Sequence, residues 1–223
     1  MKYTLIIIVV ILIAACNNNP NNVQVKDRID SVLAAIPMHD TLHMDKKLMQ
    51  NPMLESMMAT MKKMDTLKMS NDFDVDFANS MSIHHEAAID MSMLQIATGK
   101  DSMMIAMAKN IITTQKEGIA QFKKFVMNSK VTNSKMDNSD SQNILADDMK
   151  EMMRNLSGKK MMGSIDDDFA MFMILHHSTA IKMAKDELTF GKQKQMKAMA
   201  EKIIATQTAE VNKLVAWSTH LKE

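Results

Sequence analysis

The chain contains one stretch twice. Residues 76–125 and 168–217 align without a gap, and 19 of the 50 aligned positions are identical. Both copies have an Asp-Phe-Ala start, a His-His pair, a Gly-Lys dipeptide and an Ile-Ile-x-x-Gln segment. A repeat of this length indicates that each copy is one supersecondary unit, and this limits the folds open to the chain.

Each copy predicts two helices separated by a short turn. Apolar residues recur at helical spacing before and after Gly99 and Gly191, and glycine is a common helix end. We therefore expect helical hairpins at 72–127 and 166–220. With 28 Met but only five Gly and three Pro, the composition also favours helices. The prediction is an all-α four-helix bundle made of two tandem helical-hairpin repeats.

The first residues predict export. Lys2 precedes an eleven-residue apolar run that suits a signal peptide and is too short to span a bilayer. Two alanines before Cys16 resemble the bacterial lipoprotein box, in which the cysteine is lipidated and becomes the new N-terminus. The alternative is an ordinary cleaved signal with a coincidental cysteine. We expect a lipoprotein of the bacterial cell envelope, anchored through Cys16 and facing the periplasm or the cell surface.

Composition divides the rest of the chain. Residues 1–16 are the expected lipoprotein signal peptide with its lipobox. After it we expect a tether and N-terminal segment at 17–45, a first His-His/Met repeat at 46–127, a linker at 128–143 and a second His-His/Met repeat at 144–223. Removing Lys2 with the signal peptide makes the basic and acidic counts equal, which argues against nucleic acid as a partner.

The His-His pair of each copy lies beside methionines. On a helical wheel of 100° per residue, Met81, His84, His85, Ala88 and Met91 fall on one face of about 120°. The second copy repeats this face with Met173, His176, His177, Ala180 and Met183.

The other helix of each copy adds a second stripe. Its members are Met104, Met107, Ile111 and Gln115 in the first copy and Met196, Met199, Ile203 and Gln207 in the second. Within a hairpin both stripes can face one interior, so each copy can present imidazole nitrogens and thioether sulfurs to a space of its own. We expect Gln115 and Gln207 to hydrogen-bond the far nitrogen of a ligating histidine.

These donors suit copper. Thioethers select Cu(I), imidazole accepts copper readily, and hard ions prefer carboxylates. Methionine needs no deprotonation to bind and forms no disulfide in an oxidising compartment. Imidazole must be neutral to ligate, and its ordinary pKa of about 6.5 predicts weaker binding below about pH 6.

Each signal also has a simpler interpretation. Methionine fills irregular cores well, so a methionine stripe is more often packing than a ligand set. His39 and His43, which are flanked by Met38 and Met44, lie outside the repeat, and for them the choice between ligand and ordinary polar residue stays open. Two adjacent histidines repeated beside methionine at the same offsets favour a metal site.

The pattern Met-x-x-His-His, Ala-Ile-x-Met and Ile-Ile-x-x-Gln resembles the ferritin-like family called domain of unknown function 305. The resemblance covers residues 57–127 and 149–220, and it implies a ferritin-like helical bundle that binds copper through His and Met. It points to the residues of both stripes: Met81, His84, His85, Met91, Met104, Met107, Met173, His176, His177, Met183, Met196 and Met199. The family tends to have Glu three residues after the Gln. Glu210 fits this pattern, whereas the first copy has Gly118.

The sequence thus predicts a lipoprotein that binds copper, preferably Cu(I), for resistance, buffering or delivery, without a catalytic step. Its expected partners are the metal ion, the membrane and a copper-handling protein. One alternative is a metal-free, methionine-rich structural or interaction lipoprotein. A di-iron oxidase is the weaker alternative, because such sites use Glu-x-x-His and the chain contains none.

The anchor gives the first prediction. Replacing Cys16 by Ser removes the lipidated sulfur, so the variant should lose lipid labelling and be soluble or unprocessed. Stable attachment needs more than one acyl chain. The measurement is membrane fractionation with lipid labelling, and a variant that fractionates with the membrane as the parent does would contradict the anchor.

Overall fold

The computed structural model describes residues 50–70, 72–129, 138–156, 159, 161 and 163–220. All of them belong to one compact unit, Pro37–Glu223. Cys16, His39 and His43 lie outside the described residues. Within the described ranges every regular element is an α-helix, so the predicted all-α class is confirmed.

The helices follow the repeat. They are α3 (Pro52–Asp65), α4 (Phe73–Thr98), α5 (Ser102–Asn128), α6 (Asn138–Leu156), α7 (Ile165–Phe190) and α8 (Lys194–His220). The α4/α5 and α7/α8 pairs are the two predicted hairpins, and each is preceded by one further helix. The tandem-hairpin bundle is therefore confirmed, and α3 and α6 extend each repeat upstream.

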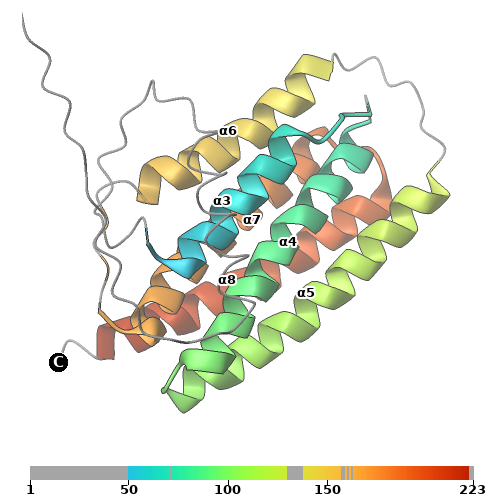
Figure 1. Ribbon diagram of the computed structural model, residues 1–223. Helices are drawn as coiled ribbons and strands as arrows, with labels where there is room; N and C mark the ends of the chain where they lie inside the picture. Colours follow the sequence, from blue (N-terminus) through green and yellow to red (C-terminus); the bar gives the residue numbers. More distant parts are fainter. Residues whose placement is uncertain are drawn as a thin grey trace, which may run out of the picture. The chain divides into compact units, whose positions relative to one another are not determined.

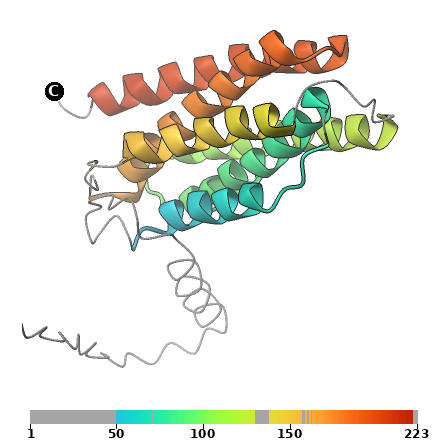
Figure 2. The same ribbon diagram turned by 90° about the horizontal axis from the view of Figure 1, so that it is seen from above.

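The helices form a layered bundle with α4 and α7 in the middle. α4 contacts α5, α7 and α3, whereas α7 contacts α8, α4 and α6. Figures 1 and 2 show α3 and α6 over one side of the α4/α7 pair and α5 and α8 along the other. Because α4 is covered on several sides, its buried residues occur all round the helix rather than along one stripe.

α6 begins earlier than the sequence predicts. It starts at Asn138, inside the segment expected as a linker at 128–143. Ser, Asn and Asp are weak helix formers, but propensity gives way to packing. Met149 and Met152 of α6 are buried in the core, and Asp148 Oδ1 lies 2.9 Å from Lys182 Nζ of α7.

Side-chain caps explain where the hairpin helices begin. Asp72 accepts a hydrogen bond from the Val75 amide at the start of α4, and Asp101 accepts one from the Met104 amide at the start of α5. Ser164 does the same for α7. These caps satisfy amides that have no partner within the helix.

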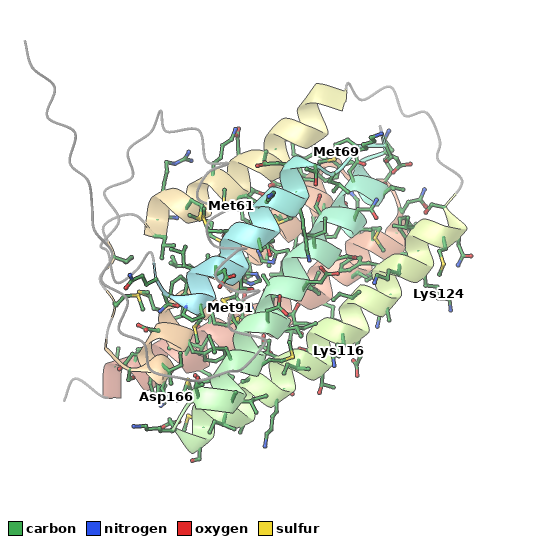
Figure 3. The ribbon with its side chains drawn as sticks, in the orientation of Figure 1. Met61, Met69, Met91, Lys116, Lys124 and Asp166 are labelled. Carbon is green, nitrogen blue, oxygen red and sulfur yellow. The ribbon has the colours of Figure 1, made fainter. Side chains whose placement is uncertain are left out.

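The two repeats also cap each other. Asp166, at the start of α7, accepts hydrogen bonds from the backbone amides of Lys100 and Asp101 in the α4–α5 turn, at 3.1 Å. Figure 3 shows Asp166 at this end of the bundle. The start of α7 thus contacts the turn that follows α4. Because the two helices also pack against each other, they run antiparallel.

The reciprocal contact closes the other end. Asp74, which is the repeat counterpart of Asp166, accepts from the backbone amides of Lys192 and Gln193 at 3.0 and 2.8 Å. Equivalent contacts in both directions indicate an approximate two-fold axis between the hairpins, as the repeat predicts.

One buried side chain differs between these two ends. Gln95 donates from Nε2 to Asp166 Oδ1 at 2.5 Å. Its counterpart beside Asp74 is Glu187, which is fully buried. Burial, with the Asp74 carboxylate next to it, raises the pKa of Glu187 to about 9. At neutral pH Glu187 is therefore an uncharged carboxylic acid next to Asp74, as the uncharged Gln95 amide lies next to Asp166.

This difference predicts a pH-dependent stability. Unfolded Glu187 ionises near its ordinary pKa of 4.5, so folding takes up a proton between that pH and about 9, and stability falls as pH rises through this window. Glu187→Gln has an amide that can donate a hydrogen bond and that takes up no proton on folding. It should stabilise the protein increasingly above pH 4.5, by up to about 1.4 kcal/mol per pH unit.

Chemical denaturation of parent and Glu187→Gln at pH 4, 6 and 8 measures the effect. The matched control is Gln95→Glu, which should introduce the same loss of stability with rising pH in the first repeat. Parallel pH profiles for all three proteins would contradict the protonated Glu187.

Candidate metal centre

The two His-His pairs meet in the middle of the bundle. His84, His85, His176 and His177 are all buried, with at most 3% of any residue exposed. The rings of His84 and His176 stack with centroids 3.7 Å apart and planes inclined at 31°. These two residues are repeat counterparts, so the stack lies on the approximate two-fold axis. We call the four residues the histidine layer.

Most ring nitrogens of the layer make no hydrogen bond. Among the described residues, both nitrogens of His84, His176 and His177 are buried and unbonded, as is Nδ1 of His85. A buried polar group without a partner costs about 1–3 kcal/mol. A protein that keeps several such nitrogens together has a candidate site for a ligand that needs lone pairs.

Burial keeps the imidazoles neutral. It lowers the pKa of His85 to about 3, helped by the nearby His177 ring. Burial also lowers the pKa of His84 and of His176 well below 6.5, and the neighbouring imidazoles add to this effect. The neutral ring is the form that ligates a metal, so three of the four histidines are available as ligands at physiological pH.

Buried methionines border the layer on both sides. Along α4, Met81 precedes the His-His pair and Met91 follows it, and both are fully buried. Met173 and Met183 bracket the second pair on α7 in the same way. Figure 3 shows Met91 inside the bundle, whereas Lys116 lies along the outer side of α5.

The antiparallel packing sorts the methionines differently from the sequence prediction. One core cluster combines Met91, Met104, Met107 and Met173. The other combines Met81, Met183 and Met196, with Met199 packed against it. Each cluster draws on both repeats, and the four histidines share one layer. The expectation that each hairpin faces a space of its own is therefore wrong, because α4 and α7 pack directly on each other.

The layer is not a finished coordination site. Within the described part of the chain, no three His, Cys, Asp or Glu side chains are placed to hold a metal ion. The rings of His84 and His176 lie one over the other, so the space between them is too narrow for an ion. A centre here needs thioether sulfur next to imidazole nitrogen, or a rotation of the stacked rings. The unbonded nitrogens and buried sulfurs fit a soft ion chemically.

The two halves of the layer are not equivalent. Nε2 of His177 lies 3.0 Å from Oε2 of Glu210, although the two atoms are not aligned for a hydrogen bond. Gly118 takes the place of Glu210 in the first repeat and lies against His85, so close that a Cβ at Gly118 would be 2.9 Å from Cδ2 of that ring. The substitution visible in the sequence thus changes the surroundings of one histidine in each pair.

The hydrogen bonds expected from the glutamines to the far nitrogens of ligating histidines stay a prediction. Gln115 and Gln207 are buried beside His85, but their side-chain oxygens have no hydrogen-bond partner in the described ranges. Sequence reasoning also missed Thr114 and Thr206, which lie next to these glutamines. Their recurrence at the repeat offset was the available signal.

The fold and the site define a class of protein: an all-α bundle of two tandem repeats that share a buried layer of neutral imidazoles bordered by thioethers. The chain belongs to the family described as domain of unknown function (DUF305), which matches residues 18–126 and 74–218. The resemblance seen in the sequence is therefore confirmed.

Solved structures of CopM are similar to this chain. CopM in the Cu(I)-bound form is 25% identical, with a TM-score of 0.50, and the match covers 67% of this chain and 98% of that one. CopM in the Ag-bound form obtained by co-crystallization is also 25% identical, with a TM-score of 0.50, and covers 66% and 96%. No curated protein matches.

None of the helices in the described part of the chain combines the length and the apolar character that crossing a bilayer needs.

Proposed function

We propose that this protein binds Cu(I) through the histidine layer and the buried methionines that border it. The observation that carries the proposal is the set of buried ring nitrogens without hydrogen bonds. Cu(I) accepts both imidazole nitrogen and thioether sulfur, and it would use lone pairs that the fold leaves unpaired.

The comparison supports the same ion. CopM has been solved in a Cu(I)-bound and an Ag-bound form, and both are soft monovalent cations. This chain has a similar fold to CopM, and it contains a buried histidine layer bordered by thioethers. Hard ions prefer carboxylate and water oxygens, whereas the buried side chains that border the histidine layer along α4 and α7 are methionines.

The cellular role follows from the expected address. A lipoprotein anchored through Cys16 would hold the bundle in the envelope, where it buffers copper, protects against it or delivers it to a copper-handling partner. No catalytic step is needed for any of these roles, and we propose a binding protein rather than an enzyme.

The proposal predicts that the two His-His pairs act together. Because they form one layer, the double variants His84→Ala/His85→Ala and His176→Ala/His177→Ala should both weaken the same high-affinity Cu(I) binding. Loss of direct ligands should cost more than about 100-fold, since even partners behind the ligands contribute 10–100-fold. The measurement is competition with a chromophoric Cu(I) chelator under reducing conditions.

Methionine and pH supply controls within the same titration. Met91→Leu removes a buried sulfur and should weaken binding, whereas Met93→Leu changes a residue that is 51% exposed and should not. The lowered histidine pKa values move proton competition below the pH of 6 expected from free imidazole, so parent affinity at pH 5 should stay close to that at pH 7. Full affinity in both double variants would contradict copper binding by the layer and favour the metal-free, methionine-rich alternative.

A further inference from the structure

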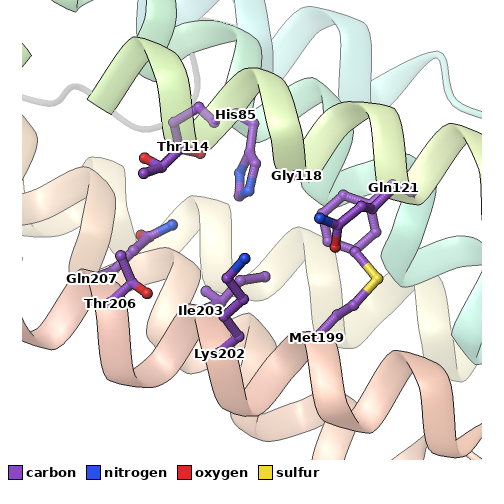
Figure 4. Close-up of a pocket in the computed structure, with 11 residues that line it drawn as sticks. His85, Thr114, Gly118, Gln121, Met199, Lys202, Ile203, Thr206 and Gln207 are labelled. Atoms are coloured by element: carbon purple, nitrogen blue, oxygen red, sulfur yellow. The ribbon is translucent and has the colours of Figure 1, made fainter. Parts of the chain in front are cut away.

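A small cavity lies between α5 and α8, directly beside the histidine layer. Its volume is about 70 Å³, enough for a few water molecules. Figure 4 shows the His85 ring projecting into it from one wall, with Thr206 and Gln207 of α8 on the opposite side. The cavity therefore reaches one ring of the layer, and Met199, which packs against the second methionine cluster, is part of its wall.

The repeat asymmetry explains why the cavity exists on this side. Gly118 lines it, and because this residue has no side chain, the His85 ring lies directly against it and reaches the cavity. On the other side of the approximate axis, Glu210 fills the equivalent position. Its Oε2 lies near His177, and its Oε1 accepts from Asn110 Nδ2 at 3.4 Å. The space beside the histidine is thus open next to His85, whereas Glu210 fills the equivalent space next to His177.

The lining changes from exposed to buried along the cavity. Lys202 and Gln121 are exposed, Thr114 and Thr206 are half-buried, and His85 is buried. Gln115 and Gln207 also line the cavity, and their side-chain oxygens are buried and unpaired in the described chain. Hydroxyl and amide oxygens can replace the water ligands of an ion one at a time as it moves inward.

We propose that this cavity is the access port through which a soft monovalent cation reaches the histidine layer, with His85 as its first imidazole contact. The port rests on the proposed function of the layer. The ion enters the shared layer beside His85 only, because Glu210 fills the equivalent position beside His177. Lys202 is the charged side chain at its mouth, and its positive charge opposes the approach of an aquo cation.

The port predicts that loading rates change while the final stoichiometry does not. Thr114→Leu places a branched apolar side chain in the cavity and should slow loading about tenfold, for which a barrier increase of about 1.4 kcal/mol suffices. Thr113→Leu alters the neighbouring, exposed threonine of the same helix and should load at the parent rate. The measurement is stopped-flow loading with Ag(I), which has no redox chemistry here, followed by the amount of metal bound at the end point.

Charge gives an independent arm that involves no packing. Lys202→Gln should speed Ag(I) loading several-fold at low ionic strength, and salt should reduce the gain, because screening weakens the repulsion. Lys213→Gln, an exposed lysine on the same helix outside the cavity, should leave the rate unchanged.

Parent-like rates in both Thr114→Leu and Lys202→Gln would overturn the port, as would a Thr114→Leu variant that loses stoichiometry along with rate. A parent protein that binds neither Ag(I) nor Cu(I) would instead overturn the proposed function of the layer.

Discussion

The stack of His84 on His176 is the contact on which the rest of the structure depends. It sits where α4 and α7 cross the approximate two-fold axis, with ring centroids 3.7 Å apart. Two like-charged imidazolium rings could not be buried at this separation, so the packing of the two repeats requires neutral histidines. Burial supplies that neutrality by lowering the pKa of both residues. The contact between the hairpins therefore keeps these two rings neutral, and neutral imidazole is the form that binds a metal.

The layer is costly, and the ends of the bundle compensate for it. Aromatic and methionine side chains fill the core on both sides of the histidines, and Phe122 packs edge to face on both Phe77 and His85. At the ends of the bundle, Asp74 and Asp166 each accept backbone hydrogen bonds from the turn between the two hairpin helices of the other repeat. Such rigid ends fix the position of the unbonded nitrogens between them. A fold that keeps unsatisfied groups at one place and satisfies them elsewhere is typical of a binding site.

Much of this could be read from the sequence, and the limit is physical. The repeat predicted the hairpins and their axis, and the helical spacing placed Met81, His84, His85 and Met91 on one face. Spacing says nothing of which faces of two hairpins meet, so the shared layer replaced the two separate spaces expected. The raised pKa of Glu187 depends on its burial and on Asp74 of the other repeat. The cavity depends on Gly118 of α5 lying across from residues of α8. These are contacts between residues far apart in the chain, and local pattern carries no information on them.

The central claim is that Cu(I) uses the lone pairs of the histidine layer together with thioether sulfur. X-ray absorption at the copper edge, measured on protein loaded with Cu(I) under reducing conditions, tests it most directly. The account predicts the scattering pattern of imidazole nitrogen together with sulfur, and a smaller imidazole contribution in a His84→Leu/His176→Leu variant, which keeps only His85 and His177 in the layer. Copper coordinated by sulfur alone in the parent, or an unchanged spectrum in the variant, would contradict it.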